Sequence, residues 1–406
     1  MIKSWDCFDT LIGRLKITPE SIFDEVGEIL GIENFRNLRL NAENRSDKTF
    51  AGIYNILSGI DKDIEFATEM KNLFPIVENM SKVQDGDIIV SDMYYSPQEV
   101  LQLLRACGLT KDVQVYVTYG GKAQGWIWDT IPNISQIELH TGDNYHSDYT
   151  MALKNNIPAH HYTGSEMTDA EKLVYKTDKE LAGWMRYVRL SCPYEDETQK
   201  YLWTDQANLN APALALACFE IPDSKLAFAY RGAENWHTIC KGFMGGDSIE
   251  LHSTRDLYFE PTEEFSKYVI ENTRDRVIVD LNCSKSSSNY FFNNQKIDYD
   301  LFCITGPASE YKEIELPFER HNLSLIGALI DVSDGKFIRK KCENKPEHIL
   351  PQKEAIKFAA ESINKFDIKQ NKMLMWQLIK LMRYSNTENL LANYWAIGNN
   401  PVEKII

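Results

Sequence analysis

The chain has 406 residues, of which 43% are hydrophobic and 25% charged, a composition typical of a globular protein with two or three domains. Its net charge of −15 disfavours nucleic acid and anionic membranes as main partners, because phosphate-rich surfaces select basic proteins. The eight cysteines form no CxxC pair, which predicts reduced thiols rather than a disulfide framework or a zinc site. Without a recognisable signal peptide or an apolar run of membrane-spanning length, the sequence predicts a cytoplasmic protein with no membrane span.

The first twelve residues after Met1 and Ile2, "KSWDCFDTLIGR", begin as a β-prone run that stops at Asp6. Residues 19–83 then read as helices, since apolar residues recur at three- and four-residue spacing in "PESIFDEVGEIL", "FRNLRLNAENRSDKTFAGIYNIL" and "DIEFATEMKNLFPIVENMSKV". This block, about 17–84, interrupts the chain directly after the first strand. We therefore expect a helical cap beside the carboxyl edge of the sheet to which that strand belongs.

A series of strands and helices follows the predicted cap. "GDIIVSDMYY" is a strand and "SPQEVLQLLRACGL" a helix with a Ser-Pro start, "VQVYVTY" is a strand leading to "GGKAQG", and "QIELHTGDN" is a strand before the helix "SDYTMALKNN". Strands that alternate with helices predict an α/β fold with a doubly wound parallel sheet over residues 1–165.

The second half of the chain has the same character. Residues 166–204 read as a helical connector, and residues 205–345 as a second, smaller α/β domain with strands such as "KLAFAYRG", "RVIVDLNC", "YDLFCITG" and "LSLIGALIDV". Residues 346–406 are a helical segment, rich in Trp, Met and Leu, that we expect to pack on that domain. A strand that ends at Asp280 before small polar residues could form an anion-binding turn, although a solvated loop is the favoured interpretation.

Polar side chains stand where four predicted strands of residues 1–165 end. They are, in chain order, Asp6, Ser91, Lys122, and the pair Asp143 and Asp148. The carboxyl ends of parallel strands meet at one edge of a sheet, so these side chains should converge there. Each alone has an ordinary explanation, as a turn acid, a helix cap or a solvated lysine, whereas the ordered set is specific. His140 and His146 flank the acidic motif, but a lone histidine is more often structural.

With these four motifs in this order, the chain resembles the haloacid dehalogenase-like (HAD) superfamily, whose helical cap occupies the place of residues 17–84. The resemblance implies an Mg²⁺-dependent phosphohydrolase in which Asp6 is the nucleophile and forms an aspartyl-phosphate. Ser91 would bind the transferring phosphoryl group and Lys122 would neutralise charge. The implied Mg²⁺ ligands are Asp6, Asp143, Asp148 and the backbone carbonyl of Phe8.

Two further residues complete the predicted substrate site. The loop that ends at Thr10 could offer backbone N–H groups to the phosphate. Asp92 could either touch the substrate or fix its own loop. A carboxylate can attack an anionic phosphate only where that charge is cancelled locally, which agrees with a lysine and a cation in the same site.

One position departs from the family pattern. Family phosphatases carry a second aspartate two residues after the nucleophile, as the general acid and base, and here Phe8 takes that position. The loss of a general acid could cost about 10²–10⁴ in rate. Three outcomes follow: a substrate with a good leaving group or its own proton, a long-lived aspartyl-phosphate that passes its phosphoryl group on, or a binding module with negligible turnover. A dehalogenase would also lack that acid, but it needs no metal, whereas "GDNYHSD" favours one.

A narrower resemblance concerns "FDTLIGR", "RLNAEN", "GIYNIL" and "VSDMY", which look like a subgroup of predicted HAD hydrolases associated with bacterial surface-polysaccharide assembly. It implies a small phosphorylated sugar or polyol as substrate and glycan-assembly enzymes as partners. The alternative is a weakly catalytic or non-catalytic scaffold module in such a system. In the cap, four residues either read the substrate or form ordinary salt bridges: Arg39, Glu43, Arg45 and Tyr54.

Overall fold

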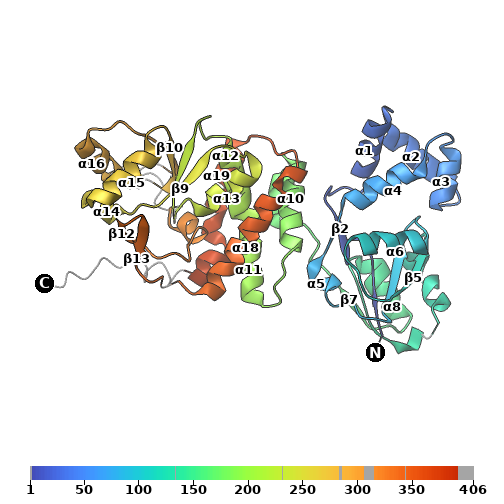
Figure 1. Cartoon of the computed structure of the whole chain (residues 1–406). Coiled ribbons are helices and arrows are strands. Elements are labelled where there is room, and N and C mark those ends of the chain that lie inside the picture. The colour runs from blue at the N-terminus through green and yellow to red at the C-terminus, as the bar shows by residue number, and fades with distance from the viewer. Residues whose placement is uncertain are drawn as a thin grey trace. The chain divides into compact units, whose positions relative to one another are not determined.

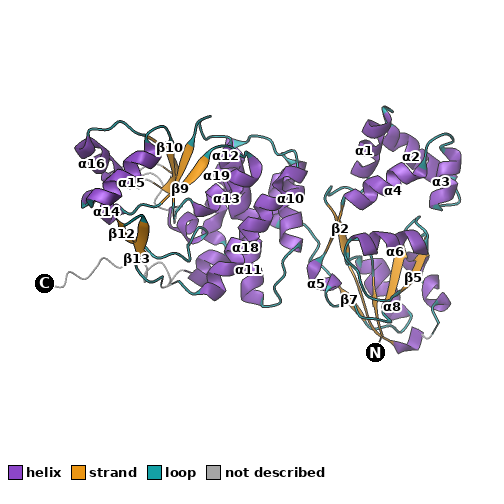
Figure 2. Cartoon of the chain, in the orientation of Figure 1, coloured by secondary structure: helices purple, strands orange, loops and turns teal. Residues whose placement is uncertain are grey.

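The computed structural model describes residues 2–132, 134–230, 232–282, 286–305, 315–342 and 344–391. The chain forms two compact units, Met1–Pro193 and Tyr194–Ile406. Their boundary falls inside the segment 166–204 that the sequence predicts as a connector. Both units combine helices with a parallel sheet, which confirms the α/β prediction at that level (Figures 1 and 2).

The sheet of the first unit has five parallel strands in the order β5-β4-β1-β6-β7. They are β1 (Ile2–Trp5), β4 (Ile88–Asp92), β5 (Gln114–Thr118), β6 (Ile137–Gly142) and β7 (Ala159–His161). Strand β4 shows why both faces are covered, since Ile88 and Val90 belong to one apolar cluster and Ile89 to another. Side chains of a strand alternate between faces, so an uninterrupted apolar run needs helices on both sides.

Helices connect these strands as the sequence predicts. Helix α6 (Pro97–Ala106) begins with a capping box in which the Ser96 hydroxyl accepts from the Glu99 N–H and the Glu99 carboxylate accepts from the Ser96 N–H. Helix α5 (Val77–Met80) lies at the end of the predicted 17–84 block, and the helices of this unit after that block also include α7 (Gly121–Gln124), α8 (Met151–Lys154), α9 (Asp169–Tyr175) and α10 (Lys179–Leu190). Helices α9 and α10 pack on each other, and most of α10 is buried.

The main part of the predicted cap is a group of four helices beside the sheet of its unit (Figure 1), and some of its buried residues share one apolar cluster with Trp5 and Ile89 of the sheet. The four helices are α1 (Ser21–Leu30), α2 (Phe35–Arg45), α3 (Phe50–Ile56) and α4 (Lys62–Lys71). The long predicted helix over 35–57 is broken, because the Thr49 side chain accepts a hydrogen bond from Gly52 N and starts α3 anew. The helical prediction is wrong over 73–75, where β3 (Leu73–Pro75) pairs antiparallel with β2 (Ile12–Arg14). This pair of short strands joins both ends of the cap to the sheet domain.

A buried ion pair holds the cap helices together. The Arg39 side chain in α2 is fully buried, and its Nε and Nη2 donate to the Glu65 carboxylate of α4 at 2.7 and 2.9 Å. The Tyr54 hydroxyl of α3 donates to the same carboxylate at 2.7 Å. The Arg39 guanidinium also lies over the rings of Phe23 and Tyr94, with centroid distances of 4.7 and 4.6 Å. One guanidinium thus joins three cap helices and the loop after β4.

In the second unit, four parallel strands follow the order β11-β10-β8-β9. They are β8 (Leu226–Ala229), β9 (Ser248–Leu251), β10 (Val277–Asn282) and β11 (Asp300–Thr305), and the predicted strand at 323–332 is instead β12 (Leu329–Ser333), paired antiparallel with β13 (Lys336–Arg339). Asp280 lies near the end of β10, but residues 283–285 of the suggested anion-binding turn lie outside the described residues.

The structure also describes helices in this second unit. They are α11 (Glu197–Asp205), α12 (Ala211–Cys218), α13 (Glu234–Phe243), α14 (Arg255–Phe259), α15 (Glu263–Thr273), α16 (Ser286–Gln295), α18 (Pro346–Ser362) and α19 (Lys372–Leu381). The C-terminal helices α18 and α19 pack on α11, α12 and α13 of the same unit. Among the described residues, no helix combines the length and the apolar character needed to cross a membrane.

We expect the buried cap pair to be essential for cap stability. Replacing Arg39→Ala leaves the Glu65 carboxylate uncompensated in a fully buried position, and the free energy of unfolding should fall by about 3–5 kcal/mol. The double variant Arg39→Met/Glu65→Gln should recover most of that loss, because it removes both charges. Urea denaturation of the full chain measures both values, and equal losses in the single and double variants would contradict the assignment.

Candidate functional site

Asp6 follows directly after β1, the central strand of the first sheet. Its backbone N–H donates to the Thr141 carbonyl on β6 at 2.8 Å, so the sheet ladder continues to the residue that carries the carboxylate. The chain then turns sharply, with the N–H groups of Leu11 and Ile12 both donating to the Cys7 carbonyl. The Asp6 side chain is buried at the mouth of this turn and faces the carboxyl edge of the sheet.

Lys122 brings the predicted strand ends together. Its ammonium group contacts the Asp6 carboxylate, lies 2.6 Å from an Asp148 oxygen and donates to the Val90 carbonyl at 3.3 Å. The lysine is 3% exposed, so this cation is shared by two buried carboxylates rather than solvated. Burial alone would lower its pKa, but the neighbouring carboxylates of Asp6 and Asp148 more than offset that effect and raise it.

Asp92 holds the Lys122 loop in place. Its Oδ1 accepts from the backbone N–H of Lys122 at 2.9 Å and from the Thr118 hydroxyl at 2.7 Å, and its Oδ2 accepts from Ala123 N at 3.0 Å. A carboxylate at the start of this short helical turn satisfies N–H groups that would otherwise lack partners. Of the two roles expected for Asp92, these bonds support that of fixing a loop, although the residue also borders the cavity described below.

His140, which is not among the predicted site residues, also anchors Asp148 and contacts the same Oδ1 as Lys122. His140 Nε2 lies 3.0 Å from Asp148 Oδ1, and the Ser4 hydroxyl lies 2.9 Å from His140 Nδ1. The Asn144 N–H donates to Asp148 Oδ2 at 3.0 Å. Burial opposes ionisation of Asp148, but Lys122 and His140 together lower its pKa below the ordinary value. His140 is thus a positioning residue, and its place three residues before "DNYHSD" on an apolar strand was the only signal for it.

Three carboxylates lie close enough to share one cation. Oxygens of Asp6, Asp143 and Asp148 lie within 4.8 Å of one another. Burial, followed by repulsion from Asp9 and Asp148, raises the pKa of Asp143 to about 6, and burial together with its acidic neighbours raises the pKa of Asp6. Lys122 supplies a single positive charge to this cluster, so the donor set fits a hard divalent cation such as Mg²⁺.

A cavity of about 350 Å³ opens over this cluster between the sheet and the cap of the first unit. Ser91, 2% exposed, and Phe8 border it together with the acidic cluster and Lys122. Thr10 is fully buried and does not border the cavity, and its hydroxyl donates to Asp143 Oδ1 at 3.4 Å. Among the described residues, no donor binds the Phe8 carbonyl, which leaves that oxygen available as a ligand.

The four cap residues named from the sequence divide into different roles. Glu43 borders the cavity, accepts from Arg39 Nη1 at 2.8 Å and accepts from the Tyr119 hydroxyl at 2.9 Å. Arg39 and Tyr54 belong to the buried cap pair with Glu65 and do not border the cavity. Arg45 is exposed and lies outside the cavity wall. The cap therefore presents Glu43 to the site, together with Glu20, Phe23 and Leu40.

Two ionic contacts near the site were not foreseen. Asp9, in a left-handed conformation with φ 54°, turns its carboxylate to Arg186 Nη2 at 2.6 Å. Arg14 at the end of β2 pairs with Glu69 through its Nε at 2.6 Å and also borders the cavity. Arg14 belongs to the motif "FDTLIGR", but only the pairing of β2 with β3 brings it back to Asp6.

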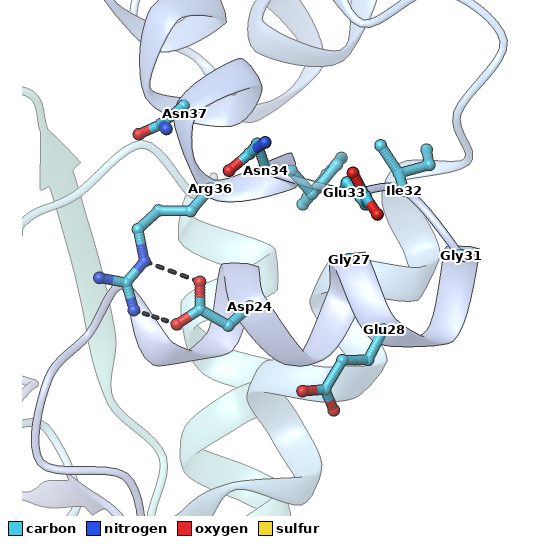
Figure 3. A pocket seen from close by; sticks show the side chains of 10 residues that line it. Asp24, Gly27, Glu28, Gly31, Ile32, Glu33, Asn34, Arg36 and Asn37 are labelled. Carbon is cyan, nitrogen blue, oxygen red and sulfur yellow. Dashed lines mark hydrogen bonds and ion pairs between the residues drawn. The ribbon is translucent and has the colours of Figure 1, made fainter.

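A larger hollow of about 640 Å³ lies between α1 and α2 of the cap (Figure 3). Its wall includes Asp24 and Arg36, which form a two-pronged ion pair across it. None of the residues that border it also borders the cavity over Asp6. Size therefore does not identify the site here, whereas the buried charges do.

Comparison with protein-family models gives no match for this sequence, and comparison with curated proteins gives none either.

We expect a divalent cation to bind the three carboxylates. Asp143→Asn should weaken binding of Mg²⁺ or Mn²⁺ by about tenfold or more, because it removes one charged ligand. Asp9→Asn is the matched control, since Asp9 borders the same cavity but pairs with Arg186. Titration calorimetry with each ion measures both, and equal weakening by the two substitutions would contradict this site.

Proposed function

We propose that the protein is a HAD-type, Mg²⁺-dependent phosphohydrolase that acts on a small phosphorylated metabolite through an aspartyl-phosphate at Asp6. The observation that carries this proposal is the shared contact of the Lys122 ammonium with Asp6 and Asp148 at the floor of a cavity. A lysine between a prospective nucleophile and a prospective metal ligand cancels charge where a phosphate would enter.

The chain's own residues account for the attack. The Asp6 carboxylate would approach the phosphorus in line with the leaving oxygen, while Lys122 offsets the charge on both the nucleophile and the phosphoryl oxygens. The Ser91 hydroxyl, buried beside them, would donate to a phosphoryl oxygen. A bound divalent cation would supply further charge neutralisation and orientation. Asp92 would hold the backbone of Lys122 in position, and His140 would keep Asp148 ionised and correctly oriented.

The site lacks a general acid and base at the position of Phe8. No carboxylate stands two residues after Asp6, and the next acid, Asp9, is paired with Arg186. Protonation of the leaving group and activation of water must then come from the substrate or another group, or turnover is slow. This observation favours the second candidate function, a weakly catalytic or non-catalytic scaffold module. The sugar or polyol substrate, the glycan-assembly partners and a cytoplasmic location remain predictions from the sequence.

A panel of phosphate esters, assayed with and without Mg²⁺, tests the enzyme against the scaffold. Wild-type protein should release phosphate only with the cation, and activated esters such as aryl phosphates should react fastest because they need no proton donor. Asp6→Asn should reduce the rate by at least about 10³-fold, since it removes the nucleophile. Lack of release from every ester, including activated ones, would leave the scaffold as the better proposal.

The control for that panel should keep the cavity and remove a charge outside the reacting cluster. Glu43→Gln suits this purpose, because Glu43 lies on the cap wall and its bonds to Arg39 and Tyr119 can be kept in part by an amide oxygen. Its rate with an aryl phosphate should stay within a few-fold of wild type, while Asp6→Asn abolishes release. Similar losses in both variants would point to a general disturbance of the cavity.

A further inference from the structure

Arg14 is a buried arginine with two unused donor groups. It is 8% exposed, and its Nε donates to the Glu69 carboxylate at 2.6 Å. Among the described residues, neither of its terminal nitrogens has a hydrogen-bond partner, and neither nitrogen is fully buried. Arg14 also borders the cavity over Asp6, so a ligand bound there would lie against this side chain.

The other buried arginine of the cap region shows what a purely structural role requires. All three nitrogens of Arg39 donate to carboxylates, Nε and Nη2 to Glu65 and Nη1 to Glu43. Arg14 differs, since Glu69 accepts only from its Nε. The two terminal nitrogens, which together form the fork of the guanidinium, remain available to a ligand. A buried donor without a partner costs free energy, so an open fork in a cavity indicates a ligand that completes it.

The Phe8 ring relates the Arg14 guanidinium to the proposed reacting groups. The Arg14 guanidinium lies over the Phe8 ring, 4.1 Å from its centroid. Phe8 stands two residues after the proposed nucleophile, where a phosphatase of the resembled family carries the acid beside the leaving group. Phe8 therefore puts an aromatic ring where the family has a proton donor, and this ring contacts the permanently charged guanidinium of Arg14.

Resting on the proposed function, we propose that Arg14 determines specificity by binding an oxyanion, a carboxylate or a second phosphate, on the leaving-group part of the substrate. Lys122 and Ser91 already serve the transferred phosphoryl group from the floor of the cavity. The cap side of the cavity wall is acidic. Glu20 has no charged partner among the described residues, and Glu43 pairs with Arg39, which also pairs with Glu65. An anionic group is repelled there and is attracted to the guanidinium fork.

Binding to Asp6→Asn in the presence of Mg²⁺ tests this without turnover. One ligand pair is 3-phosphoglycerate and glycerol 3-phosphate, which differ by a carboxylate in place of a hydroxymethyl group. The other pair is fructose 1,6-bisphosphate and fructose 6-phosphate, which differ by a second phosphate. In at least one pair, the ligand with the additional oxyanion should bind about tenfold or more tightly. The pair that discriminates identifies which oxyanion Arg14 takes.

The variants separate recognition from folding. Arg14→Lys keeps the positive charge beside Glu69 but loses the fork, so the preference should shrink to about threefold or less. Glu69→Gln is the matched control, because it removes the ionic partner of Arg14 and leaves the fork intact, and the preference should persist. The double variant Arg14→Gln/Glu69→Gln, which leaves no unpaired buried charge, should lose the preference while retaining its fold by circular dichroism.

Three results would overturn the proposal. Absence of preference in both pairs excludes an oxyanion at Arg14. Equal weakening of both members of a pair by Arg14→Lys places Arg14 on the transferred phosphoryl group instead. If inorganic phosphate with Mg²⁺ also fails to bind, the proposed function fails together with this inference, whereas phosphate that binds without any preference between pair members refutes the Arg14 assignment alone.

Discussion

The site depends on one buried ammonium group. Three carboxylates within 4.8 Å of one another repel, and burial further opposes their ionisation. Lys122 lies against two of them and is itself held by the backbone bonds to Asp92. Lys122 favours the charged forms of Asp6 and Asp148, and the proposed nucleophile and cation site both depend on those charged forms. The lysine therefore sets the charge state on which every proposed role of the cavity rests.

The parallel sheet brings these side chains together, because the carboxyl ends of its strands lie at one edge. Asp6 follows the central strand, Lys122 follows the edge strand β5, and Asp148 comes from the turn after β6 on the other side. Loops at one edge of such a sheet can change without disturbing the ladder. The π-helical turn at Tyr145–Thr150 is one such feature, since it directs Asp148 back toward Lys122 while Asn144 closes the turn.

The sequence predicted the parallel sheet of the first unit and the helical cap because apolar runs and three- to four-residue periodicity are local signals. It did not predict β2 and β3, since three-residue strands carry no periodicity and form only through pairing across the whole cap. For the same reason Arg14 was read as part of a motif rather than as a wall of the site. The contact between His140 and Asp148 depends on tertiary geometry, so a histidine on an apolar strand gave no reason to choose it.

Buried charge also bears on the choice between enzyme and scaffold. Apolar residues of similar volume would stabilise the floor of the cavity at least as well as a lysine among three carboxylates. A module that only presents a surface gains nothing from a costly cluster beneath a cavity, whereas phosphoryl transfer needs opposed charges that are desolvated and fixed before substrate enters. Phe8 does not weaken that argument, because it removes proton donation and leaves the charge cluster intact. In the proposed reaction it would restrict turnover to substrates whose leaving group needs little help, and its ring lies under the Arg14 guanidinium.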